Sequence, residues 1–140
     1  MKDLDETLLK IHELLHDYVK NNTTNSIDYL LDIQDKLCIW GMRLAEITAD
    51  CKTTYNYQYF IRKIHVSKQI QNLIKQGTRI GQASNSAIAD NEEVFNAEQE
   101  SESIAYKADL ILKQLNKSLS AIQQRISHLK YERQNAQNTS

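Results

Sequence analysis

The strongest constraint on the fold is a run of apolar residues near the end of the chain, spaced alternately three and four positions apart. Its members are Ala105, Ala108, Leu112, Leu115, Leu119, Ile122, Ile126 and Leu129. An α-helix brings residues at this spacing onto one face, as in a heptad seam. The pattern predicts a long helix over residues 88–133 that packs against another helix, followed by a frayed tail at 134–140.

Two earlier segments carry the same spacing. The first contains Leu4, Leu8, Ile11, Leu15 and Tyr18, and it predicts a helix over residues 3–20. The second contains Leu30, Ile33, Leu37, Trp40, Leu44, Ile47 and Cys51, and after a weaker stretch it resumes at Ile61, Ile64, Ile70 and Leu73. It predicts one helix over residues 27–76, bent near residues 52–58.

Polar and glycine-containing stretches separate these segments. The sequence NNTTNS at 21–26 favours a turn, with Ser26 as the N-cap of the next helix. Proline is absent, and two of the three glycines lie in GTRIGQASNS at 77–86. That stretch is predicted to be the main turn, with Gly77 just beyond the end of a helix, where a positive φ costs glycine little.

The distribution of charge predicts how the long helices pair. Residues 51–89 contain six Lys or Arg and no Asp or Glu, whereas residues 90–102 contain six Asp or Glu and no Lys or Arg. An antiparallel pairing about the 77–86 turn brings these stretches together, with Arg62 near Glu100 or Glu102. The expected fold is all-α: an elongated, coiled-coil-like antiparallel helical hairpin with a third, N-terminal helix, forming a single helical domain over 1–140.

The same pairing predicts the register of the hairpin. Equal distance from the turn places Leu115, Leu119, Ile122 and Ile126 opposite Trp40, Leu44, Ile47 and Cys51. At the far end, it brings acidic Asp28, Asp32 and Asp35 toward basic Arg125, Lys130 and Arg133. Each exposed ion pair contributes little, so their joint effect is to favour the antiparallel orientation.

Residues 12–16 read HELLH, which matches the H-E-x-x-H signature of zinc hydrolases. A catalytic zinc site needs a third protein ligand, and no extension of the motif supplies one. His12 is expected to border the buried face of its helix and His16 to point outward. Phosphate-loop and nucleophile-elbow motifs are also absent from the sequence, so no catalytic residues, metal or cofactor are expected, and the protein is predicted not to be an enzyme.

Three further features concern partners and location. The net charge of −1 indicates no polyanionic or membrane partner, and no apolar run approaches the length of a membrane span. The amino-terminal segment lacks the features of a signal peptide, so a cytoplasmic location is expected. If Cys38 and Cys51 share one helix, they lie roughly 20 Å apart and should be free thiols.

The strongest functional candidate is a basic and aromatic stretch at 51–79. On a helix, Lys52, Tyr55, Tyr59, Arg62 and Lys63 form a loosely continuous stripe. Two rings and three cations suit single-stranded nucleic acid, through base stacking and phosphate contacts. The alternative is that the tyrosines belong partly to the core and that the basic residues pair with the acidic helix opposite.

From Ala49 onward, over residues 49–133, the layout resembles a family of small helical early proteins of tailed bacteriophages and prophages. The matching features are TTYNYQYFIRK, then LIKQG followed by small polar residues, an acidic helix with Tyr106, and the closing RISHLKYE. Genes of that family often lie near those for recombination and single-strand-binding proteins. The resemblance implies an early phage protein, with no catalytic residues to carry over.

Together these features predict a non-enzymatic phage accessory protein of DNA recombination or replication that binds a protein or single-stranded DNA. One alternative is an inhibitor of a host nuclease or defence system that acts by binding a protein. Another is a structural or assembly coiled coil, such as a scaffold or chaperone. The expected partner is a protein, either a second copy in a homo-oligomer or a phage or host protein, with single-stranded nucleic acid as the second candidate.

The HELLH interpretation can be tested by elemental analysis. We expect the purified protein to carry no stoichiometric zinc, because the motif has only two histidines and no third ligand. One zinc per chain, lost on His12→Ala, would contradict this prediction.

Overall fold

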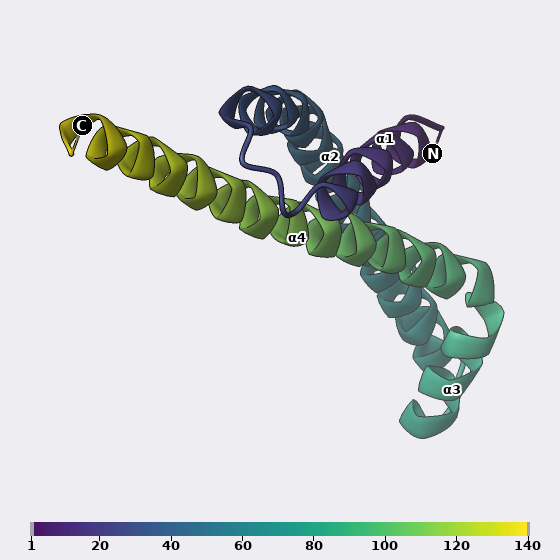
Figure 1. Ribbon diagram of the computed structural model, residues 1–140. Coiled ribbons are helices and arrows are strands. Elements are labelled where there is room, and N and C mark those ends of the chain that lie inside the picture. The colour runs from purple at the N-terminus through teal and green to yellow at the C-terminus, as the bar shows by residue number, and fades with distance from the viewer. Residues whose placement is uncertain (1, 140) are drawn as a thin grey trace. The chain divides into compact units, whose positions relative to one another are not determined.

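The computed structural model describes residues 2–139, which form four α-helices and no strand (Figure 1). They are α1 (Lys2–Lys20), α2 (Ile27–Lys75), α3 (Ile80–Asp90) and α4 (Glu92–Asn138). The chain divides into two compact units, one made of Met1–Thr48 and Ala108–Ser140, the other of Ala49–Lys107. The all-α class and the antiparallel pairing of α2 with α4 are confirmed.

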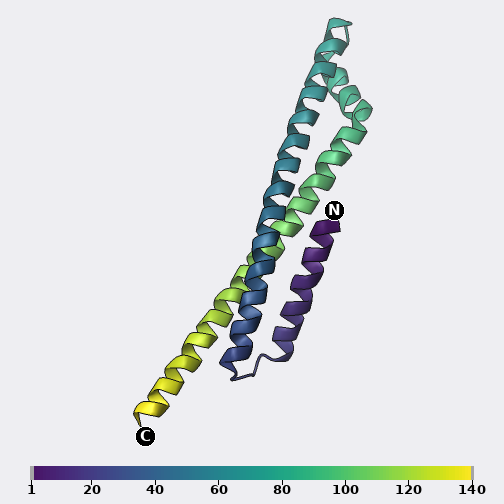
Figure 2. The same ribbon diagram turned by 90° about the horizontal axis from the view of Figure 1, so that it is seen from above.

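In the first unit, α1 runs antiparallel to the first half of α2 (Figure 2). The predicted N-cap is confirmed, because the Ser26 hydroxyl accepts a hydrogen bond of 3.2 Å from the Tyr29 backbone N–H. The Tyr29 hydroxyl lies 3.0 Å from the Asp17 carboxylate, to which it donates. The guanidinium of Arg125 donates from Nε, at 3.1 Å, and from Nη2 to the Thr24 carbonyl. The Ser26 and Thr24 bonds attach the α1–α2 loop to α2 and to α4, and the Tyr29–Asp17 bond joins α2 to α1.

The core of the first unit lies between these three helices. Its most buried large side chains are Ile11, Leu30, Leu37, Leu44, Leu115, Ile122 and Ile126. Leu119, Trp40 and Ile47, which were expected to face one another at the centre, are only half-buried at its margin. Most residues of the predicted seam are therefore buried, but the buried face of each helix is narrower than the spacing alone suggested.

Two contacts give the register of α2 on α4 in this unit. The Gln34 amide donates to the Gln123 side-chain carbonyl at 2.7 Å. Two turns further on, a Cβ built on buried Gly41 would lie 2.9 Å from Leu115 Cδ2. The two helices approach closely here because Gly41 has no side chain.

The expected ion pairs at the far end of the hairpin differ from the observed contacts. Arg125 binds the Thr24 carbonyl, and Asp32 pairs at 2.9 Å with Lys36 on its own helix. Residues four apart on a helix are adjacent without any tertiary packing, so this local pair forms at less entropic cost than a pair between helices.

In the second unit, the predicted turn at 77–86 is wrong, because Ile80–Asp90 forms α3. The end of α2 is as expected: Gly77 has φ of 90°, its N–H donates to the Ile74 carbonyl, and the Thr78 N–H donates to the Leu73 carbonyl. Ala83 and Ala87, one turn apart, form the buried face of α3. These small side chains lack the large apolar spacing that marked the other helices, and Arg79 gives no side-chain cap.

The junction between α3 and α4 depends on Asn91. Its side-chain amide donates to the Ala87 carbonyl at 2.7 Å and to the Gln69 side chain of α2. Gln69 in turn donates to Asp90 at 2.8 Å. The Asn91 carbonyl accepts bonds from the first turn of α4, so α4 begins at Glu92.

The single long helix predicted over residues 27–76 is confirmed as α2 (Ile27–Lys75). Residues 52–58 belong to it, and the Thr53 hydroxyl donates back to the Ala49 carbonyl at 3.1 Å. One boundary differs from expectation. The tail expected to fray from residue 134 is helical to Asn138. It contains no glycine or proline, so nothing in its sequence stops the helix.

Truncation of the core should destabilise the first unit. Leu44→Ala removes a fully buried side chain at the α2–α4 contact, and we expect it to lower the free energy of unfolding by about 2–5 kcal/mol. Ile39→Ala, on the same helix but 66% exposed, is the matched control and should change it by about 0.5 kcal/mol or less. Urea denaturation followed by circular dichroism measures both, and equal losses would contradict this assignment of the core.

Candidate functional site

All the predicted site residues lie on the part of α2 that belongs to the second unit. Tyr55, Tyr59 and Arg62 are half-buried, whereas Lys52 and Lys63 are exposed. The rings of Tyr55 and Tyr59 have centroids 6.5 Å apart and are tilted by 48°. The structure therefore brings the predicted rings and Arg62 together, but it turns them toward α4 more than toward solvent.

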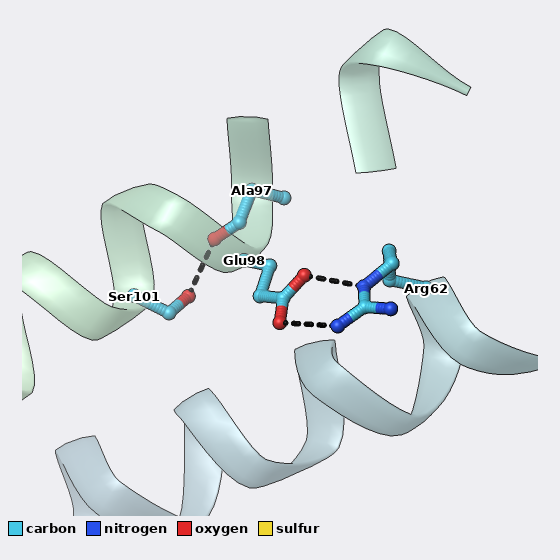
Figure 3. A network of polar contacts seen from close by, with 4 residues as sticks. All are labelled: Arg62, Ala97, Glu98 and Ser101. Carbon is cyan, nitrogen blue, oxygen red and sulfur yellow. Dashed lines mark hydrogen bonds and ion pairs between the residues drawn. The ribbon is translucent and has the colours of Figure 1, made fainter. Parts of the chain in front are cut away.

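Arg62 is held by Glu98 of α4 (Figure 3). Its Nε and Nη2 atoms donate to the two carboxylate oxygens of Glu98, at 2.7 Å and 3.0 Å. Only 23% of the Arg62 side chain and 13% of the Glu98 side chain remain exposed. A two-bond, mostly buried pair of this geometry restricts both side chains and matches the rigid fork of the guanidinium.

We expected Arg62 to pair with Glu100 or Glu102. The observed partner, Glu98, lies one half to one turn of α4 before those residues. The expectation assumed a simple turn centred near residue 81, whereas α3 occupies residues 80–90. The extra helix changes which turn of α4 lies opposite Arg62. The Arg62–Glu98 pair nevertheless joins the basic stretch at 51–89 to the acidic stretch at 90–102, as the charge distribution predicted.

Aromatic rings complete the surroundings of Arg62. Its guanidinium carbon lies 5.1 Å from the ring centroid of Tyr59 and 5.4 Å from that of Phe95 on α4. The Lys63 ammonium lies 4.7 Å from the Tyr59 centroid. We call Tyr55, Tyr59, Arg62, Phe95 and Glu98 the Arg62 cluster.

The electrostatics of the Arg62 cluster follow from this geometry. The hydrogen bonds from Arg62 lower the pKa of Glu98, and the same bonds raise the pKa of Arg62. Burial raises the pKa of the Tyr55 hydroxyl, with a smaller contribution from the carboxylates of Glu102 and Glu98. Arg62 is thus neutralised within the unit, and the internal pairing considered as the alternative is observed for this residue.

Sequence reasoning missed a row of exposed apolar residues on α2 of the second unit. Tyr57, Phe60 and Ile64 are 62%, 60% and 50% exposed, and their spacing of three and four places them on one face of α2. We call these three residues the exposed stripe. Ile64 had been assigned to the buried seam, which is wrong. The spacing was visible in the sequence, but only the packing of α4 shows which face is covered.

The HELLH residues lie on the solvent-exposed surface of α1. His12, Glu13 and His16 are all exposed on α1, so His12 does not border the core as expected, and Glu13 lies 3.8 Å from the Lys10 ammonium. Within residues 2–139, no group of three or more His, Cys, Asp or Glu side chains is arranged to hold a metal ion. Over the same range, no helix is long and apolar enough to cross a bilayer.

The two cysteines are free, as predicted: Cys38 is exposed and Cys51 is buried. Burial raises the pKa of the Cys51 thiol, with a smaller effect from Asp50. Cys38 is therefore the accessible thiol of the two, since Cys51 is both covered and less readily ionised.

Comparison of the sequence with protein-family models and with curated proteins gave no match, and comparison of the fold with solved structures gave none either.

The Arg62–Glu98 pair should make stability depend on pH. Because the folded pKa of Glu98 lies below its unfolded value of about 4.3, the pair contributes fully above that pH and its contribution is lost as the pH falls through the folded pKa. We expect Glu98→Gln to cost about 1.5–3 kcal/mol at pH 6, and less at about pH 3.

Urea unfolding of the wild type and the variant at both pH values measures this difference. Glu100→Gln, which changes an exposed carboxylate on the same helix, is the matched control. A Glu98→Gln effect that is independent of pH would show that the carboxylate contributes by packing and not by its charge.

Proposed function

We propose that this protein is a non-enzymatic binding module that holds a protein partner against the exposed stripe on α2. The observation that carries the proposal is that Tyr57, Phe60 and Ile64 are all at least half exposed at helical spacing. Large apolar side chains grouped in this way are a feature of interaction sites, whereas scattered ones are ordinary. Aromatic residues are also enriched at the centres of protein interfaces.

The charges beside the stripe indicate the chemistry of the partner. Lys63 and Lys68 are exposed within one turn of Phe60 and Ile64, and residues 51–89 contain no acidic residue. A complementary partner would present apolar side chains flanked by carboxylates. An amphipathic helix with an acidic margin has this arrangement, because it can lie along α2 and place apolar residues every three or four positions.

Two features favour a protein over single-stranded nucleic acid. Arg62, the cation best suited to a phosphate, already binds Glu98 through its Nε and Nη2 atoms. Ile64 is aliphatic and offers no face on which a base can stack, yet it forms one end of the exposed stripe. Tyr57, Phe60 and the nearby lysines keep nucleic acid as the alternative that the experiment must separate.

The resemblance of residues 49–133 to small helical early proteins of phages supports a role as an accessory protein in phage DNA recombination or replication. In such a role the protein holds a partner and does not change it chemically. Tyr57 and Phe60 of the exposed stripe lie within the TTYNYQYFIRK segment on which that resemblance partly depends, and Ile64 follows it directly.

Site-specific photo-crosslinking tests the proposal in cells that produce the protein. A photoreactive phenylalanine analogue placed at Phe60 should capture one discrete protein, and a second change, Ile64→Ser, should reduce the yield several-fold. The analogue at Tyr131, which is 63% exposed on α4, is the matched control and should not capture the same protein. Equal capture from both positions, or none from Phe60, would contradict the proposal.

A titration with labelled single-stranded oligonucleotide separates the nucleic-acid alternative. We expect no binding at low salt that depends on the stripe. Binding that falls steeply with salt, is lost in Lys63→Glu/Lys68→Glu and persists in Ile64→Ser would assign this face to nucleic acid instead.

A further inference from the structure

The second unit contains a polar pocket beside the exposed stripe, where α2 passes the α3–α4 junction. It has a volume of about 360 Å³, which is at the lower end of the range for ligand pockets. The residues that line it are His65, Lys68, Gln69, Asn72 and Asn91. A polar space of this size suits one side chain of a partner. We call it the Lys68 pocket.

Two of the lining side chains already have hydrogen-bond partners. Asn91 and Gln69 are half-buried, and the Asn91 amide donates to the Gln69 side-chain carbonyl and, at 2.7 Å, to the Ala87 carbonyl. Gln69 in turn donates to the Asp90 carboxylate at 2.8 Å. These bonds join α2 to the α3–α4 junction, and they hold that side of the pocket in a defined geometry.

The other three lining side chains have donors without a partner. His65, Lys68 and Asn72 are exposed, and within residues 2–139 their side chains make no hydrogen bond or ion pair. Their spacing of three and four residues places them on one face of α2. An imidazole, an ammonium and an amide therefore line the same space, and each of them can donate a hydrogen bond. Such a set of donors is suited to an anionic oxygen group.

The charges around the pocket favour a carboxylate over a phosphate. Lys68 is the one ammonium among the residues that line it. Asp90, Glu92 and Glu93 are the acidic residues of the α3–α4 junction, and in the described part of the chain none of them makes an ion pair with Lys68. A phosphate group carries up to two negative charges, so these carboxylates would oppose it more than they oppose a single carboxylate.

We infer that the Lys68 pocket receives the carboxylate of an aspartate or glutamate of the protein partner that lies on the exposed stripe. This inference rests on the proposed function and makes the partner more specific. Lys68 follows Ile64 by one turn of α2, and its position lies about 40° from that of Ile64 around the helix axis. The pocket therefore begins at the end of the stripe that Ile64 forms.

The spacing along α2 gives the partner a sequence requirement. One helical turn rises about 5.4 Å, so the carboxylate in the pocket lies about that far along α2 from the side chain that packs on Ile64. On a partner helix, this separation corresponds to three or four residues. The partner should therefore carry an acidic residue one turn from an apolar one. Lys63 offers charge without a pocket, because its ammonium lies 4.7 Å from the Tyr59 ring centroid and it does not line the Lys68 pocket.

Binding of two designed helical peptides to the full chain tests the inference. The first carries a leucine with a glutamate four residues before it and another four residues after it, so that either direction of the peptide is covered. The second has glutamines at both positions. The wild type should bind the glutamate peptide several-fold more tightly than the glutamine peptide, and Lys68→Met and Asn72→Ala should each remove most of that preference. Lys75→Met, which removes the same charge from an exposed position of α2 outside the pocket, is the matched control and should retain it.

A third peptide, with alanine in place of the leucine, separates the inference from the proposed function. An effect of the leucine without an effect of the glutamates retains the exposed stripe and overturns the pocket. An effect of the glutamates that depends on Lys68, without an effect of the leucine, retains the pocket and contradicts the stripe.

Three other outcomes would overturn the inference. The first is no binding of the glutamate peptide at millimolar concentration, and the second is an equal loss of preference in Lys68→Met and Lys75→Met. The third concerns the side-chain amide resonances of Asn72, which the glutamate peptide should shift saturably in nuclear magnetic resonance spectra. A saturable shift with inorganic phosphate, but not with the glutamate peptide, would assign the pocket to phosphate instead.

Discussion

The packing of α2 against α4 is the interaction on which the rest of the structure depends. In the first unit, it buries Leu30, Leu37 and Leu44 of α2 together with Leu115 and Ile122 of α4. Burial of that apolar surface offsets the loss of conformational entropy on folding. Within this unit, the packed seam fixes the direction in which each helix presents its remaining faces. The apolar surface lined by Met42, Ala45 and Leu112 is such a face, and it does not exist without the seam behind it.

The two units stabilise the same pair of helices by different means. The first relies on apolar side chains and on the close approach at Gly41, whereas the second places a charged pair between aromatic rings. In the second unit, Ala83 and Ala87 are the buried residues of α3, and the large residues at its α2–α4 contact are half-buried. Polar contacts such as Arg62–Glu98 and Gln69–Asn91 are therefore more important there. They are directional, so they restrict which residues can lie opposite one another.

The sequence predicted most of this framework and less of its surface. Leu115, Ile122 and Ile126 could be assigned to the core because large apolar residues at helical spacing must be covered. The helix at 80–90 was missed because its buried face consists of alanines, which give no such signal, and that omission led to the wrong partner for Arg62. Tyr57, Phe60 and Ile64 could not be recognised as exposed, since spacing identifies a face of a helix but not what covers it.

Thr7 has a consequence for how the protein opens. Its hydroxyl is fully buried in α1 without a hydrogen-bond partner, which costs about 1–3 kcal/mol, and Leu4 and Ile11 are the other two buried residues of that helix. The other apolar side chains of α1 that contact the unit are only half-buried, so α1 should be the most weakly attached of the helices in the first unit; they are Leu8, Leu14, Leu15 and Tyr18. Its amides would then exchange with solvent through local detachment while α2 and α4 stay paired. The amino-terminal helix is thus the part of this fold that can be released without unfolding the remainder.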